Sequence, residues 1–87
     1  MEAIPKKYQP PKEINPEHQE LMLKIGCKLA ELRKAKKISS SGLARELKIS
    51  RNAYHLMETG KTYFNVLSLL LVLDYHQIPA SEFFVTL

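Results

Sequence analysis

Four side chains near the middle of the chain have types and spacing that could recognise a ligand: Arg51, Asn52, His55 and Leu56. On a helix that starts at Arg51 they would all point away from the core. Arginine and asparagine in the first turn of a helix suit bidentate hydrogen bonds to guanine and adenine edges in the major groove. A leucine cannot form such bonds, but it can contact the methyl group of thymine. These residue types indicate recognition of base pairs.

No other group of residues has the pattern of a catalytic or metal site. His18, His55 and His76 fall on different predicted helices and share no ligand spacing with Cys27. The chain contains no glycine-rich phosphate loop and no pair of carboxylates arranged for a cleft. We therefore predict a protein that is not an enzyme and that uses neither a cofactor nor a metal. Cys27 itself is expected to be a partly buried helix residue.

Two short helices with a tight turn between them are predicted to position the four side chains. Ser39 and Ser50 are suitable N-caps, which predicts helices at about 40–47 and about 51–58. Gly60 lies where a glycine would end the second of them. The predicted inward-facing residues are Leu43, Ala44, Leu47, Tyr54 and Met57. These lengths are typical of a helix-turn-helix motif.

Four segments carry a longer pattern around this motif: I-G-x-x-L-x-x-L-R at 25–33, L-A-x-x-L-x-I-S at 43–50, E-x-G-K at 58–61 and I-x-x-x-E-F-F at 78–84. In this order and spacing the sequence resembles the phage repressor/Cro-like helix-turn-helix family, also called XRE-like. The resemblance implies an all-α fold, a compact bundle of about five helices that forms a lambda-repressor-like DNA-binding domain with a central helix-turn-helix. It also implies a transcriptional regulator, of the repressor type, that binds specific sequences in double-stranded DNA.

The same resemblance assigns roles to individual positions. Base contacts fall on Arg51, Asn52, His55 and Leu56, and phosphate contacts fall on Ser40, Lys61, Tyr63 and Asn65. At Asn65 the backbone amides of a helix N-terminus would contribute whatever the side chain is. Arg33 and Glu58 align with a structural ion pair. A glutamate at the end of a helix is unfavourable for the helix dipole unless a cation compensates it, which supports the pair.

Two features of the sequence depart from the family pattern. Ser41-Gly42 stands where the family has an acidic pair, and Lys48 occupies a turn position where the family prefers glycine. A lysine can adopt positive φ in that turn at a cost of about 1 kcal/mol. These departures leave a second interpretation open, in which a helical protein–protein interaction module keeps the fold without specific DNA binding.

The N-terminal part of the chain divides into an arm and a helix. Residues 1–14 contain three prolines and three lysines and predict a flexible arm, followed by the folded domain at 15–87. The arm either has no partner or touches DNA or a partner chain. Asn15-Pro16 predicts the start of a helix that continues to about Lys37. Its inward stripe is predicted to be Leu21, Ile25, Leu29 and Leu32.

Two further features of this helix have competing explanations. Gly26 predicts either a bend or the close approach of another element. The basic cluster at its end consists of Arg33, Lys34, Lys36 and Lys37. The cluster could bind phosphate, or it could simply complement the negative end of the helix dipole in solvent.

A fourth helix is predicted at about 66–76, with Asn65 as its cap, and its apolar residues surround it almost completely. One stripe is Val66, Leu69, Leu70 and Leu73, which we assign to the core. The other is Leu67, Leu71 and Tyr75, which we predict to form a homodimer interface. Alternatively, the arm and the early part of the first helix could cover this second stripe. A last short turn is expected near Phe83 and Phe84.

Size and charge limit the remaining possibilities. The chain has 87 residues, 45% of them hydrophobic, which favours one folded domain. Its formal net charge of +4 favours an anionic partner. Its single cysteine cannot form an internal disulfide, so a reducing compartment fits. We find neither an apolar signal core nor a run long enough to span a membrane. The expected location is the cytoplasm.

Overall fold

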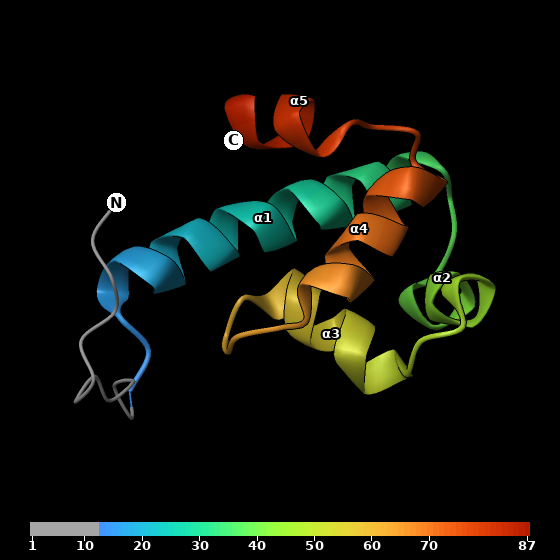
Figure 1. Cartoon of the computed structure of the whole chain (residues 1–87). Helices are drawn as coiled ribbons and strands as arrows, with labels where there is room; N and C mark the ends of the chain where they lie inside the picture. Colours follow the sequence, from blue (N-terminus) through green and yellow to red (C-terminus); the bar gives the residue numbers. More distant parts are fainter. Residues whose placement is uncertain (1–12) are drawn as a thin grey trace.

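The computed structural model describes residues 13–87, which form five helices and contain no strand (Figure 1). The helices are α1 (Pro16–Ala35), α2 (Ser40–Leu47), α3 (Arg51–Thr59), α4 (Val66–Tyr75) and α5 (Ala80–Val85). Figure 1 shows α1 spanning the molecule, with α2 and α3 on one side of it and α5 on the other. The predicted all-α bundle is confirmed. The predicted arm lies almost wholly outside the described residues.

Short side-chain hydrogen bonds start four of the helices at the predicted residues. The caps are Asn15, Ser39, Ser50 and Asn65, whose side-chain oxygens accept from the amides of Glu17, Gly42, Ala53 and Leu67 at 2.7, 3.0, 2.9 and 2.7 Å. Each bond satisfies an amide that has no partner within its own helix. Gly60 ends α3 at φ 64°, in the left-handed region that glycine adopts without strain.

The backbones of α1 and α3 approach each other closely at two glycines. A Cβ atom on Gly26 would overlap the carbonyl oxygen of Glu58 and lie 2.8 Å from that of Met57. A Cβ on Gly60 would lie 2.9 Å from the Cα of Leu23. Of the two predicted roles for Gly26, the structure therefore shows the close approach. This crossing fixes α3 on the side of α1 that faces away from α5 (Figure 1).

The core contains one or more side chains from every helix. Its most buried members are Leu29, Leu43, Ala44, Tyr54, Met57, Val72, Leu73 and Phe83. In α1 one predicted member is wrong, because Leu21 is 45% exposed and Met22 is buried instead. In α1 the two positions differ by one residue, or about 100° of rotation. The 60–64 loop passes close to this part of α1, since a Cβ on Gly60 would lie 2.9 Å from backbone atoms of Met22 and Leu23. Cys27, expected to be partly buried, is exposed.

The predicted faces of α4 also need correction. Leu69, Val72 and Leu73 face the core, whereas Val66 and Leu70 are 66% and 41% exposed. A helix that is apolar nearly all round offers no polar side, so periodicity alone cannot choose the buried stripe. The predicted dimer stripe is divided in the same way. Its members are Leu67, which is exposed, Leu71, which is half-buried, and Tyr75, which packs partly against the core.

Candidate nucleic-acid interface

The turn between α2 and α3 has the geometry that the sequence predicts. Lys48 adopts φ 58° and ψ 39°, and the amide of Ile49 donates to the carbonyl of Ala44 at 3.0 Å. Ala44 has no exposed surface, because α2 and α3 pack together at this position. The lysine tolerates a conformation that costs a non-glycine residue about 1–2 kcal/mol. The result is a helix-turn-helix with a fixed angle between its two helices.

The first turns of α2 and α3 form a shallow hollow of about 350 Å³. It is lined by Ser40, Arg51, Asn52 and His55, and all four side chains are exposed. The structure thus brings together one predicted phosphate contact and three of the four predicted base contacts. Leu56, the fourth, is only half-exposed. Every side chain that lines the hollow can hydrogen-bond, so this surface suits a polar ligand.

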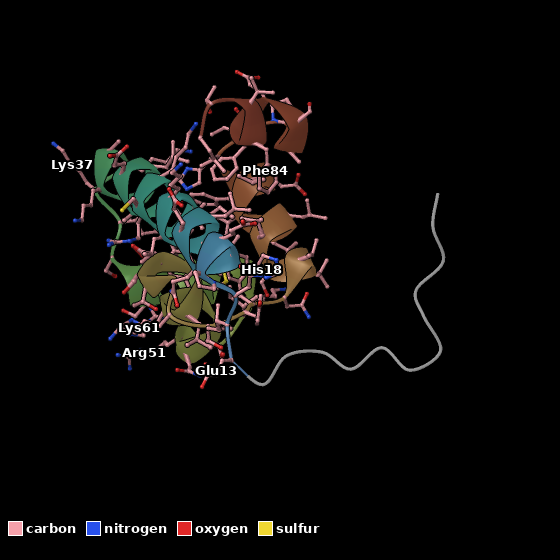
Figure 2. The ribbon with its side chains drawn as sticks, turned by 90° about the vertical axis from the view of Figure 1, so that its left-hand side faces the viewer. Glu13, His18, Lys37, Arg51, Lys61 and Phe84 are labelled. Carbon is pink, nitrogen blue, oxygen red and sulfur yellow. The ribbon has the colours of Figure 1, made fainter. Side chains whose placement is uncertain are left out.

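The other three predicted phosphate contacts follow α3 on the loop that leads to α4. Lys61 is exposed and lies on the same side of the molecule as Arg51 in Figure 2, although α3 separates the two along the chain. Tyr63 is 49% exposed. The side-chain oxygen of Asn65 already accepts from Leu67, so at this position the N-terminus of α4 is the group available to an anion.

A nearly buried ion pair supports α3 from behind. Arg33 on α1 donates to both carboxylate oxygens of Glu58, with its Nε at 3.0 and 3.2 Å and its Nη2 at 3.1 Å. The two side chains are only 16% and 12% exposed. The Nη1 of Arg33 donates to the carbonyl of Ile38 at 2.9 Å, just before α2. A single guanidinium therefore ties together α1, the turn before α2, and α3.

The ion pair affects the electrostatics of its neighbours. Its hydrogen bonds to Glu58 raise the pKa of Arg33. Burial, followed by the negative charge of Glu58, raises the pKa of Tyr54 far above its usual range. The hydroxyl of Tyr54 is buried and makes no hydrogen bond to the described residues. At neutral pH Arg33 is therefore positively charged and Tyr54 is neutral, and neither changes its charge near that pH.

The basic cluster at the end of α1 has two kinds of member. Arg33 is used by the ion pair, and the ammonium group of Lys36 lies 4.8 Å from the centre of the Tyr75 ring and donates to the Tyr75 carbonyl at 3.4 Å. Lys34 and Lys37 are exposed. Part of the cluster is therefore engaged in contacts within the fold, which neither explanation predicted, and the rest is open to solvent.

Few carboxylates neutralise the basic residues of this surface. Within residues 13–87 the ion pairs are Arg33–Glu58 and Lys24–Glu20, and neither involves Arg51 or Lys61. The same part of the chain contains no group of three or more side chains that could hold a metal ion. None of its helices combines the length and the apolar character needed to cross a membrane.

One contact near this surface has no counterpart in the sequence analysis. The Nδ1 of His18, at the start of α1, lies 2.6 Å from the hydroxyl of Tyr63. The side-chain amide of Gln19 donates to the carbonyl of Gly60 on the same loop. These partners are more than 40 residues apart in the chain. No local pattern links them, and only the crossing of α1 and α3 brings them together.

Comparison with protein-family models, with curated proteins and with solved structures finds no match to this chain. The family resemblance consequently rests on the four sequence segments. The site itself rests on the geometry of α2, α3 and the following loop.

Proposed function

We propose that this protein is a sequence-specific DNA-binding regulator that inserts α3 into the major groove. The observation that carries the proposal is the exposed polar hollow at the start of α2 and α3, lined by Ser40, Arg51, Asn52 and His55. An α-helix fits the width of the major groove of B-form DNA. The resemblance to the phage repressor/Cro-like family supports the same function, and the net charge of +4 favours an anionic partner.

Specificity would come from the first two turns of α3. Arg51 can bond the O6 and N7 atoms of guanine, and Asn52 can bond the N6 and N7 atoms of adenine. His55 can donate to or accept from a base edge, and the half-exposed Leu56 can contact a thymine methyl. Each bidentate pair contributes about 1–3 kcal/mol of discrimination between bases.

Affinity would come from groups on both sides of α3. Ser40 and Lys61 can bond phosphates of the two DNA strands, and the N-terminus of α4 at Asn65 attracts a third anion. Tyr63 has an exposed hydroxyl on the same loop. These contacts orient α3 in the groove without distinguishing one base pair from another.

We also propose that the protein binds its site as a homodimer through α4. One such domain contacts only a few base pairs, so two copies on a two-fold related site recognise a DNA sequence long enough to be specific. Val66, Leu67 and Leu70 are 66%, 64% and 41% exposed, and they place an apolar surface on one side of α4. Soluble monomers rarely keep such patches. α4 also carries only one charged residue, Asp74, so two copies can meet there with little repulsion.

The test is selection of bound sequences from random duplex DNA, followed by a salt titration of the selected site. We expect one enriched site with two related halves whose centres are about 34 Å apart. Arg51→Ala should weaken binding and remove the preference at one position, because it deletes a base contact. Lys61→Ala should weaken binding to all sequences and flatten the salt dependence by about one unit. If selection enriches no sequence, the proposal is wrong.

A second candidate is the protein–protein interaction module. The observation in its favour is the same exposed surface of α4, together with an apolar hollow of about 260 Å³ beside it. That hollow is lined by residues of α1, the 60–65 loop, α4 and Phe84 of α5. The DNA selection separates the two candidates, because an interaction module of this kind would enrich no site. Both candidates fit the cytoplasm, where the exposed thiol of Cys27 would remain reduced.

A further inference from the structure

The start of α1 holds the loop that precedes α4. The ring of His18 meets the ring of Tyr63 edge to face, with 5.7 Å between centroids and 71° between planes, and its Nδ1 lies 2.6 Å from the Tyr63 hydroxyl. Gln19 bonds the carbonyl of Gly60 at the other end of the same loop. The Gly60 backbone also lies close to that of Leu23. The loop is therefore positioned by α1, although the chain connects it to α3 and α4.

The hydrogen bond between His18 and Tyr63 limits what Tyr63 can do. A phenol has one hydrogen to donate, and a neutral imidazole has one nitrogen that donates and one that accepts. If Nδ1 accepts, the hydrogen of Tyr63 is used within the pair. If Nδ1 carries a hydrogen, it donates to the Tyr63 oxygen and the hydroxyl hydrogen is free. DNA phosphates only accept hydrogen bonds, so only the second arrangement lets Tyr63 bind a phosphate.

We propose that His18 is a positioning residue for phosphate binding by Tyr63. In the DNA complex its Nδ1–H donates to the Tyr63 oxygen, and the Tyr63 hydroxyl donates to a backbone phosphate. The edge-to-face contact of the two rings holds the phenol in place while it does so. Tyr63 is 49% exposed, so its hydroxyl can reach a ligand. The inference rests on the proposed DNA-binding function and adds a residue of α1 to it.

Four substitutions separate this role from simple support of the fold. His18→Asn places an amide, which can donate, where Nδ1 now lies. His18→Asp has nearly the same shape but only accepts. His18→Phe keeps an aromatic ring and removes the hydrogen bond. Tyr63→Phe removes the hydroxyl itself. His18 is in the first turn of α1 and exposed, where neither Asn nor Asp should prevent folding.

The experiment measures the affinity of the full chain for the duplex obtained by selection, at several salt concentrations. We expect Tyr63→Phe and His18→Phe each to lose about tenfold in affinity, since a hydrogen bond to a charged group is lost. His18→Asn should keep the affinity within about twofold, and His18→Asp should lose at least as much as His18→Phe. In the Tyr63→Phe background, His18→Asn and His18→Phe should have equal affinities for the duplex. The salt dependence should not change for Tyr63→Phe, because no charge is removed.

Ser81→Ala is the control. It removes an exposed hydroxyl from α5, on the side of α1 that faces away from α3, and should leave the affinity unchanged. The inference is overturned if Tyr63→Phe binds as well as the wild type, or if His18→Asn is as weak as His18→Phe. Failure of the wild type to bind any selected duplex would reject the proposed function itself. Retained wild-type binding with no effect of these substitutions would reject the role of His18 alone.

Discussion

The outward faces of α3 and α4 are opposite in character, although the helices are of similar length and each buries its other side in the same core. On α3 the exposed residues are Arg51, Asn52 and His55. On α4 they include Val66, Leu67 and Leu70. The first set can hydrogen-bond at every position, whereas the second set cannot hydrogen-bond at all.

This difference separates two kinds of partner. On a surface of hydrogen-bonding groups, hydrogen bonds to water can be replaced by hydrogen bonds to a polar ligand. The edges of base pairs are such a ligand. An exposed apolar surface is stabilised only when another apolar surface covers it, at roughly 25 cal/mol per Å² removed from water. In the proposed function, one small domain would thus bind DNA through α3 and a second copy of itself through α4. Substitutions can test each half of this comparison separately.

The largest expected effect comes from removing the support of α3. Glu58→Ala leaves the guanidinium of Arg33 nearly buried without its carboxylate, so the free energy of unfolding should fall by about 3–5 kcal/mol. Chemical denaturation measures this loss. A double-mutant cycle with Arg33→Met should recover part of it, because the second substitution removes the unpaired charge. Independent effects of the two substitutions would contradict the structural role of the pair.

The next effect concerns the exposed face of α4. Leu70→Glu should give a folded monomer that binds its DNA site at least about tenfold more weakly, because it places like charges across a two-fold interface. Sedimentation and DNA titration measure the two parts of this prediction. Leu71→Glu is the control on the same helix. Leu71 is half-buried, so its substitution should lower stability instead. A wild type that sediments as a monomer at high concentration would exclude the dimer.

A smaller effect should appear in the pH dependence of stability at the end of α4. His76 is 9% exposed, and neither ring nitrogen has a partner among the described residues. Burial, and then the charge of Lys36, lowers the pKa of His76. Below a pH of about 6.5 the unfolded chain therefore binds more protons at this site than the folded chain. Stability from this group is complete above that pH and decreases as the pH falls.

The measurement for His76 is chemical denaturation at a series of pH values from neutral to mildly acidic. His76→Leu should reduce the acid sensitivity of the wild type. His55→Leu, on the exposed side of α3, serves as the control for the loss of a histidine. Equal pH dependence in the wild type and His76→Leu would show that other groups cause the acid sensitivity.

The smallest effect is at the turn that sets the angle of α3. Lys48 has φ 58°, so Lys48→Gly should relieve strain and raise the free energy of unfolding by about 0.5–1 kcal/mol. Thermal unfolding would then shift upward by a few degrees. Lys34→Gly is the opposite control, because it lies within α1 and should destabilise by about 1 kcal/mol. A destabilising Lys48→Gly would mean that the side chain contributes more than its strain.

Local features of this protein could be predicted from the sequence because their causes are local. The caps at Asn15, Ser39, Ser50 and Asn65 each bond an amide two or three residues further along. The end of α3 depends on Gly60 alone. The ends of α1 and α4 differ from the predictions by one or two residues, as helix ends without a strong stop signal often do. The clustering of Arg51, Asn52 and His55 also follows from helix geometry once α3 starts at Arg51.

The Arg33–Glu58 pair is a different case, because family resemblance indicated it and the geometry confirms it. The two residues are 25 positions apart. A pattern shared with a family can carry such information across the chain, whereas helical periodicity cannot. For the same reason, helical periodicity predicts for Gly26 either a bend or a close approach and does not choose between them. Only the position of Glu58 beside it decides the matter.

Tertiary structure alone decided which sides of α1 and α4 are covered. In α4 an apolar residue stands at nearly every angle around the helix, so the buried set of Leu69, Val72 and Leu73 depends on where α2, α3 and α5 lie. In α1 the choice between Leu21 and Met22 depends on how the other elements pack against this helix. The His18–Tyr63 bond depends on the position of the 60–64 loop against α1. Such features depend on how separate helices cross. The residues next to each position in the sequence do not determine that crossing.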